Sequence, residues 1–350
     1  MSVPDQFFAL GDFPLACGRV LPEARLAYRV YGALNGARDN LVLYPSSYGA
    51  RPEDIEWVVG PILDPQRWCV VLVNQFGNGV SSSPSNSALG LRENGWELDH
   101  RDNLRAQVRL LEEVFGVERP ALVYGWSMGA QQAYHWGVLE PGRARALCCL
   151  CGTARTTPHN RLFLLSLRQA LTADPTWTGR GFAGVPETGL RTFALIYASW
   201  AASQPFYRQE RHRQLGFESV EAYVEQAWLP AYRRHDPRDL LTMIDVWLAN
   251  DVAAAAGCGD DLAAALGRVR APTLVLAGSH DLYFTPDDCA AEAALLPRGR
   301  FGRLESVLGH RAGNPRDDPA LQSALRGALD ALVEGGAPPE LPLPLATSPL

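Results

Sequence analysis

Short, uninterrupted apolar runs are the feature that most limits how this chain can fold. Five such runs recur without polar alternation: Leu41–Tyr44, Cys69–Val73, Ala121–Tyr124, Ala146–Leu150 and Thr273–Ala277. Strands have this character when helices cover both faces of a parallel sheet. Helical patterns over Asp102–Phe115 and Met128–Leu139 lie between runs, and further strands are expected over Leu26–Tyr31 and Phe301–Leu304. The alternation predicts a doubly wound, mostly parallel α/β sheet with helices on both faces.

The alternation of strands and helices stops over residues 157–262, a stretch much longer than an ordinary connection. This stretch is rich in helix formers and aromatic residues and holds no run typical of a buried strand. We therefore expect residues 157–262 to form a helical lid inserted into a core made of residues 1–156 and 263–334. Residues 335–350 are rich in Pro, Ala and Leu and are expected to form a loose tail.

Composition and charge exclude several classes of protein. The 350 residues carry a formal charge of −6, which provides no overall basic field for a nucleic acid. No run of about 18 apolar residues is present, and the first six residues lack the features of a secretory signal, so neither a membrane span nor export is expected. The seven cysteines are too few for a disulfide scaffold, and Cys148, Cys149 and Cys151 lie in or next to an apolar run. We predict a cytoplasmic protein with buried thiols and no metal site.

A pentapeptide with small residues at alternate positions follows one of the predicted strands. It reads Gly125-Trp126-Ser127-Met128-Gly129 and is followed by a helical pattern. A Gly-x-Ser-x-Gly string is weak evidence alone, but a strand before it and a helix after it are the context of a nucleophilic serine. Ser127 would stand at the helix N-terminus, where free amides and the helix dipole favour developing negative charge. The sequence therefore predicts that Ser127 is a nucleophile.

A serine nucleophile needs a base and a carboxylate that orients the base, and in this arrangement the acid precedes the histidine in the chain. Two histidines follow residue 272, namely His280 and His310. Asp281 directly follows the last predicted buried strand, and His310 lies in a glycine-flanked loop, so we predict Asp281 as the acid and His310 as the base. Asp287 and Asp288 are alternative acids, although their place after Thr285-Pro286 is typical of a helix start.

Backbone amides are expected to hold the negative oxygen that forms during attack by the serine. One should be the amide of Met128, directly after the nucleophile. The other should come from the loop Pro45–Gly49, with the Ser47 amide as the first choice and Tyr48 as the second. The loop Asn74–Ser83 is expected either to line the mouth of the substrate pocket or to be a plain surface loop, and Asn78 within it is a candidate substrate contact.

These motifs resemble the homoserine O-acetyltransferase family of the α/β-hydrolase superfamily over nearly the whole chain. The matching strings include Tyr31–Asn35, Gly125–Gln132, Arg168–Ala170, Asp174–Trp177, Gly189–Leu190, Phe217–Tyr223, Asp281 and Gly309–His310. The resemblance implies an α/β-hydrolase fold with an inserted helical lid and a Ser-His-Asp triad beneath it. It also implies transfer of acetyl from acetyl-CoA through an acyl-serine, and dimers that pair through the lids.

Departures from the family concern the acceptor pocket. The family's lid arginine, which resembles an anchor for the acceptor carboxylate, aligns with Ala194, and Arg191 is a candidate substitute one turn away. The residue before the nucleophile is the bulky Trp126 in place of glycine, and it too is a candidate substrate contact. A carboxylate buried without such an arginine is costly. Homoserine is therefore not the acceptor that these residues favour.

Three functions remain open from the sequence. A serine-dependent hydrolase of small or medium acyl esters, without a cofactor, agrees best with the altered acceptor pocket. An O-acetyltransferase that moves acetyl from acetyl-CoA, as co-substrate, to homoserine or another hydroxyl acceptor is the alternative. A non-catalytic binding relative is the third. In each case the expected ligand is a small ester or thioester, with no nucleic acid or membrane partner, and a homodimer through the lid is possible on the resemblance.

Overall fold

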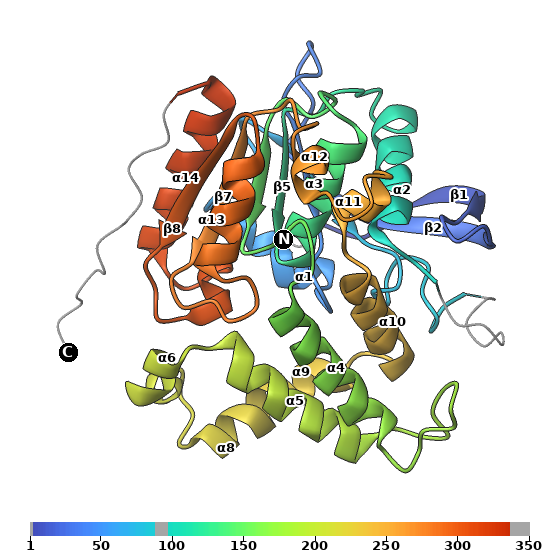
Figure 1. Ribbon diagram of the computed structural model, residues 1–350, viewed down its shortest axis with the longest axis vertical. Helices are drawn as coiled ribbons and strands as arrows, with labels where there is room; N and C mark the ends of the chain where they lie inside the picture. The colour runs from blue at the N-terminus through green and yellow to red at the C-terminus, as the bar shows by residue number, and fades with distance from the viewer. Residues whose placement is uncertain (1–2, 88–96, 337–350) are drawn as a thin grey trace.

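An eight-stranded sheet runs through the protein in the computed structural model, which describes residues 3–87 and 97–336 (Figure 1). The spatial order is β1-β2-β4-β3-β5-β6-β7-β8. The strands are β1 Gln6–Pro14, β2 Val20–Tyr31, β3 Leu41–Pro45, β4 Cys69–Asn74, β5 Leu122–Trp126, β6 Leu147–Leu150, β7 Thr273–Gly278 and β8 Gly299–Leu304. The β1–β2 and β2–β4 pairs are antiparallel, and every pair from β4 to β8 is parallel. The predicted mostly parallel sheet is confirmed.

The two faces of the sheet are covered by different helices because successive strand side chains point in opposite directions. Leu43, Val123 and Val275 belong to one apolar cluster, which also contains side chains of three helices, α2 His100–Glu113, α3 Met128–Leu139 and α13 Pro286–Leu295. Their strand neighbours belong to a second apolar cluster with α1 Pro52–Ile55, η1 Glu56–Val58 and α14 Pro319–Glu334. Burial on both faces explains the uninterrupted apolar runs.

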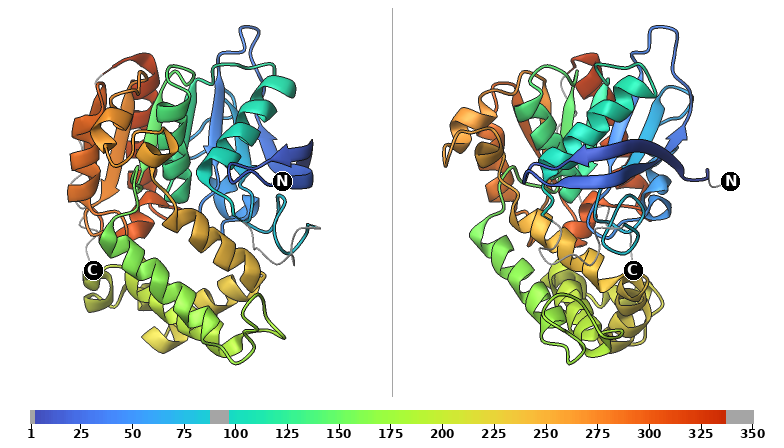
Figure 2. Two further views of the ribbon diagram at one scale, coloured as in Figure 1. Left: turned by 45° about the vertical axis from the view of Figure 1, so that its right-hand side comes forward. Right: turned by 90° about the vertical axis from the view of Figure 1, so that its right-hand side faces the viewer.

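The segment between β6 and β7 is helical, and we call residues 157–262 the helical insertion. Its elements are α4 Pro158–Thr172, α5 Glu187–Ala201, α6 Gln204–Arg208, α7 Arg211–Gln214, α8 Val220–Tyr223, the π-helical turn η2 Val224–Trp228, α9 Leu229–Arg233, α10 Pro237–Leu248 and α11 Val252–Ala255. The next helix, α12 Leu262–Leu266, begins at the last residue of the insertion. Most of these helices form a separate layer beyond one end of the sheet (Figure 2). That end is the carboxyl end of the parallel strands, because α4 follows soon after β6.

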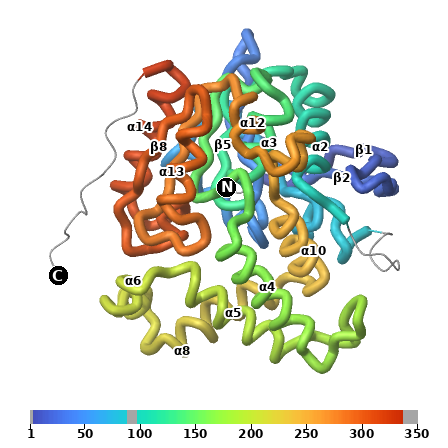
Figure 3. Tube along the Cα trace, viewed as in Figure 1, coloured from blue at the N-terminus to red at the C-terminus, as the bar shows by residue number. Residues whose placement is uncertain are grey.

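Part of the N-terminal sheet was not anticipated. The predicted strand over Leu26–Tyr31 is the second half of β2, whose first half continues outward and pairs with β1. The hairpin lies at the edge of the sheet, beside the sheet's parallel part, and the chain trace shows it projecting from the core (Figure 3). Register shifts on both sides of Gly11 interrupt its alternation, which explains why the pattern is weak in the sequence.

The structure bears only in part on two further predictions, concerning a membrane span and the C-terminal tail. Among the described residues, no helix combines the length and the apolar character needed to cross a bilayer. The predicted tail, residues 335–350, lies almost entirely outside the described residues.

Candidate active site

A sharp turn joins β5 to α3 and carries Ser127. Ser127 has φ 59° and ψ −125°, a backbone conformation that a residue with a side chain rarely adopts. The glycines on either side are required by packing: a Cβ on Gly125 would overlap the carbonyl of Gly129, and a Cβ on Gly129 would lie 2.5 Å from the carbonyl oxygen of Pro45. The turn therefore fixes Ser127 at the start of α3, with β3 close against it.

Asp281 and His310 come together although 29 residues separate them. The Nδ1 atom of His310 lies 2.7 Å from Oδ2 of Asp281, and both side chains are buried. Since a carboxylate only accepts hydrogen bonds, Nδ1 carries a proton, and in the neutral imidazole the lone pair is then on Nε2. The other carboxylate oxygen accepts hydrogen bonds from the amides of Tyr283 and Phe284, at 2.8 and 3.2 Å. The acid is thus fixed in orientation, and it fixes the histidine in turn.

Aromatic rings enclose the imidazole of His310. The indole of Trp126 stacks on it with centroids 5.0 Å apart, and the ring of Tyr283 meets it edge-on at 4.7 Å. Phe284 lies at 5.6 Å. Trp126 directly precedes Ser127, so this stacking places the histidine against the turn that carries the serine. Tyr283 and Phe284 were not predicted as neighbours of His310, although their position two and three residues after Asp281 could have indicated it.

The loop after β3 lies against the same turn. The hydroxyl of Ser47 donates to the carbonyl oxygen of Trp126 at 2.6 Å. Within the described residues, the amides of Ser47 and Tyr48 have no hydrogen-bond partner, and Met128 is the first residue of α3, where a helix leaves its amides unpaired. Three unpaired donors therefore come from the two segments that meet at Ser127.

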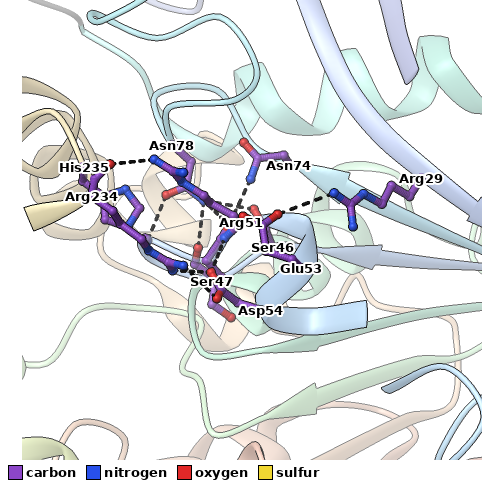
Figure 4. A network of polar contacts seen from close by, with 12 residues as sticks. Arg29, Ser46, Ser47, Arg51, Glu53, Asp54, Asn74, Asn78, Arg234 and His235 are labelled. Carbon is purple, nitrogen blue, oxygen red and sulfur yellow. Dashed lines mark hydrogen bonds and ion pairs between the residues drawn. The ribbon is translucent and has the colours of Figure 1, made fainter. Parts of the chain in front are cut away.

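Asn78, a predicted substrate contact, forms hydrogen bonds with the loop after β3. Its side-chain oxygen accepts from the amide of Gly49 at 2.8 Å, and its nitrogen donates to the carbonyls of Ala50 and Ser47 at 2.8 and 3.2 Å (Figure 4). The side chain is buried, and its hydrogen-bonding groups are occupied by the protein. The structure places Asn78 as a brace for the loop after β3.

The candidate acceptor residues of α5 differ in exposure. Arg191 is exposed and forms an ion pair with Glu225, so the structure does not bring it to the other predicted residues. Ala194, three residues further along α5, is fully buried and belongs with Phe193 and Tyr197 to the buried side of the helix. Both of those rings stack on Tyr48 of the loop after β3, with centroids 6.4 and 5.8 Å apart. Tyr48, Phe193 and Tyr197 thus form an aromatic wall in the region where the resemblance predicts a cationic side chain.

One group of potential metal ligands gathers among the described residues. Ligand atoms of Cys151, Asp281 and His310 lie within 4.8 Å of one another. Burial raises the pKa of the Cys151 thiol well above its usual range, so the thiol stays protonated at neutral pH. Only the thiolate is a good ligand, and the Asp281 carboxylate is already bonded to His310. The donor set therefore fits a hydrogen-bonded acid–base pair better than a metal ion.

The predicted alternative acids have structural roles. Asp288 accepts from the hydroxyl of Thr285 at 2.7 Å, and the hydroxyl oxygen of Thr285 accepts in turn from the Asp288 amide. Asp287 lies beside it in the first turn of α13. Both residues thus belong to the start of that helix, as the Thr285-Pro286 pattern indicates.

Comparison with known proteins agrees with this geometry. Residues 41–310 match the family described as the alpha/beta hydrolase fold. The chain belongs to the α/β-hydrolase family. Within it, the ethyl acetate hydrolase of Pseudomonas veronii is 39% identical over 88% of this chain and 89% of its own length. The solved structure of the acetyl esterase MekB superposes with a TM-score of 0.89 at 37% identity, covering 95% of this chain and 97% of that one.

The resemblance to acetyltransferases is confirmed within the same family. The homoserine O-acetyltransferase of Chlorobium chlorochromatii is 28% identical over 84% of this chain and 87% of its own length. This similarity is lower than that to the esterases just named. The α/β hydrolase described here therefore shares a family with both kinds of enzyme and is more similar to these esterases.

Proposed function

We propose that this protein is a serine-dependent hydrolase of small acyl esters that works through an acyl-Ser127 intermediate. The observation that carries the proposal is the buried hydrogen bond between His310 and Asp281, 2.7 Å long, beside the turn that holds Ser127. The similarity to an ethyl acetate hydrolase and an acetyl esterase supports a short acyl group. Residues 1–156 and 263–334 would form the catalytic core, and residues 157–262 the lid.

The chemistry follows from the protonation states in the site. The Oγ of Ser127 attacks the ester carbonyl carbon as its proton passes to Nε2 of His310, and the amides of Met128 and Ser47 or Tyr48 hold the oxyanion. The ester C–O bond then breaks, and the alcohol leaves with the proton from His310. Water attacks the acyl-serine, gives a proton to His310, and the acid leaves as Ser127 regains that proton. The chain itself supplies every group that this cycle uses.

Hydrolysis is favoured over transfer by the aromatic wall. A hydroxyl acceptor with a free carboxylate needs a cation or several donors in the site. Ala194 is buried, and the exposed Arg191 pairs with Glu225. This surface suits a neutral, apolar alcohol group better than an amino acid. Acetyl-CoA would enter as a co-substrate only in the transferase alternative.

Parallel assays test the proposal. Purified protein should hydrolyse p-nitrophenyl acetate and ethyl acetate, and Ser127→Ala should lose that activity while keeping its fold. CoA release from acetyl-CoA should not increase when homoserine is added. Homoserine-dependent CoA release with little ester hydrolysis would instead establish the transferase. Ligand binding without turnover by the wild-type protein would point to a binding relative.

We also propose self-association through the helical insertion. Leu162 and Leu165 on α4 and Leu195 on α5 are 62%, 41% and 51% exposed, and these two helices are neighbours. Exposed apolar side chains of this size are candidates for an interface. A second copy of this chain would cover them. Sedimentation equilibrium should give a dimer, and Leu162→Glu with Leu195→Glu should give a monomer; a wild-type monomer at micromolar concentration would reject this proposal.

A cytoplasmic location is proposed on the state of the thiols. All seven cysteines are unpaired, and two of them, Cys17 and Cys258, are at least partly accessible. Free accessible thiols suit a reducing compartment. Fractionation of cells that express the protein at native level would test this, and recovery in the oxidising periplasmic fraction would contradict it.

A further inference from the structure

A chain of buried amide side chains connects the body of the protein to the loop after β3. The indole nitrogen of Trp136 donates to the side-chain oxygen of Gln107 at 2.8 Å, and the Gln107 nitrogen donates to the oxygen of Gln132 at 2.6 Å. The nitrogens of Gln132 and Gln75 then both lie within hydrogen-bond distance of the carbonyl oxygen of Ser46, at 3.2 and 3.0 Å. These four side chains and Ser46 are all less than 2% exposed.

Trp136, at the end of this series farthest from Ser46, sets the orientation of each amide group. An indole nitrogen can only donate, so the Gln107 oxygen must face Trp136 and its nitrogen must face Gln132. The Gln132 oxygen is thereby occupied, and its nitrogen is turned toward Ser46 and toward the oxygen of Gln75, 3.3 Å away. This second contact orients Gln75 with its own nitrogen toward Ser46. A single donor-only group thus sets the orientation of three amides.

The Ser46 carbonyl is part of the same peptide unit as the Ser47 amide. A trans peptide is planar, and its C=O and N–H point in opposite directions. Two donors that hold the Ser46 oxygen therefore also hold the Ser47 N–H, and aim it away from the glutamines. That N–H has no partner within the described part of the chain. Leaving a buried donor unpaired costs free energy, and active sites tolerate this cost where the donor meets a developing charge.

We infer that the Trp136–Gln107–Gln132–Gln75 chain positions the Ser47 amide as an oxyanion donor. The inference rests on the proposed function and adds residues that do not touch the substrate. Gln132 lies on α3, the helix that begins after Ser127. The hydrogen-bonded side chains therefore hold the Ser47 amide at a fixed position relative to Ser127. The neighbouring peptide unit, with the Tyr48 amide, is held separately through Asn78, which donates to the Ser47 carbonyl.

The test compares Gln75→Met, Gln132→Met and the double variant. Methionine keeps the shape of glutamine and removes its donors. Each single variant leaves one hydrogen bond to Ser46 and should lower kcat about 3- to 10-fold, and the double variant roughly 100-fold, the range seen when an oxyanion donor is lost. KM for p-nitrophenyl acetate should change less than twofold. The inhibition constant of an alkylboronic acid, whose adduct with Ser127 imitates the tetrahedral intermediate, should rise in proportion to the loss of kcat.

A matched control separates positioning from stability. Asn40 also donates from its side chain to two backbone carbonyls, of Ala33 and Arg67, but stands at the opposite end of β3. Asn40→Leu should lower the melting temperature and leave kcat unchanged per active site, as counted by titration with a fluorophosphonate. Failure of the wild type to react with the fluorophosphonate would reject the proposed function rather than this inference.

Several results would overturn the inference. One is a folded double variant that keeps kcat and the boronate inhibition constant within threefold of the wild type. Another is a loss of kcat fully explained by fewer titrated sites. If the double variant keeps the kcat of the wild type while a folded Asn78→Leu variant is inactive, the oxyanion donor is the Tyr48 amide instead. If the double variant does not fold, single variants with unchanged kcat and boronate affinity decide against it.

Discussion

The indole of Trp126 lies nearly parallel to the imidazole of His310, with ring centroids 5.0 Å apart and planes inclined by 23°. The proposed mechanism makes this imidazole positively charged while Ser127 attacks. An indole face attracts a cation through its quadrupole. Trp126, which stands where the resemblance leads one to expect glycine, would therefore both pack against the proposed base and stabilise its charged form.

Replacing Trp126 should slow the reaction. Trp126→Leu is expected to lower kcat about 3- to 30-fold, because contacts of this kind contribute roughly 0.5–2 kcal/mol. Initial rates with p-nitrophenyl acetate measure the effect. Trp177→Leu is the control, since Trp177 is half-buried against Phe182 in the helical insertion and has no contact with His310. Equal rates for Trp126→Leu and the wild type would contradict the prediction.

Asp281 should be indispensable for rate but not for folding. Asp281→Asn can donate to Nδ1 of His310 and so favours the tautomer that cannot accept the Ser127 proton. We expect kcat to fall roughly 10⁴-fold, as in other serine triads. Asp288→Asn, at the start of α13, should keep full activity. Activity that survives in the first variant and disappears in the second would move the acid to Asp288.

The glycine after the nucleophile should tolerate no side chain. Gly129→Ala places a Cβ 2.5 Å from the Pro45 carbonyl oxygen, and overpacking of this kind costs roughly 1–3 kcal/mol. Gly327→Ala in α14 meets nothing within 4 Å and should instead stabilise the protein by about 0.5–1 kcal/mol. Urea unfolding gives both values. Two changes of the same sign would show that the packing at the turn is not as tight as described.

Glu292 should make stability depend on pH. Its carboxyl accepts from the Ala154 and Arg155 amides at 2.7 and 3.3 Å, and burial raises its pKa to about 8 from an ordinary 4.5. Because the folded state holds this proton more tightly, its stabilising effect is complete below about pH 4.5 and is lost as pH rises through 8. Between those limits the free energy of unfolding should fall by up to about 1.4 kcal/mol per pH unit.

Unfolding of Glu292→Gln checks this dependence. Glutamine keeps an acceptor and has no proton to lose, so the slope of stability between pH 5.5 and 7.5 should be shallower than in the wild type by that amount. The variant should gain most over the wild type at the upper end of the range. Identical slopes for the two proteins would show that Glu292 is not the group responsible.

Local patterns predicted the central sheet because burial on both faces leaves an uninterrupted apolar run. The strand β5 and the helix α3 were placed within one or two residues of their observed ends. The strand β1 was missed because it lies at an edge, is largely exposed and is interrupted at Gly11. A strand with few buried side chains does not need a regular pattern of apolar residues.

The candidate site was readable from the sequence where its residues follow strand ends. Ser127, Asp281 and His310 each stand beside a strand or a glycine-rich turn, and position along the chain singled them out. Contacts between buried amides could not be read in this way: Gln75 and Gln132 are 57 residues apart, and nothing in either local sequence indicates that their side chains meet. The pairing of Arg191 was unreadable for a related reason, since its partner Glu225 is 34 residues away in the chain.

The hydrogen bond from Ser47 to the Trp126 carbonyl ties the oxyanion loop to the nucleophile within the core. In the proposed mechanism the acyl part of the substrate would lie against this core, and the alcohol that leaves or accepts would lie against the helical insertion. A change confined to α5 can then alter the alcohol or acceptor without disturbing the acylation step. Such modularity gives evolution a short route between esterases and acyltransferases that share this family.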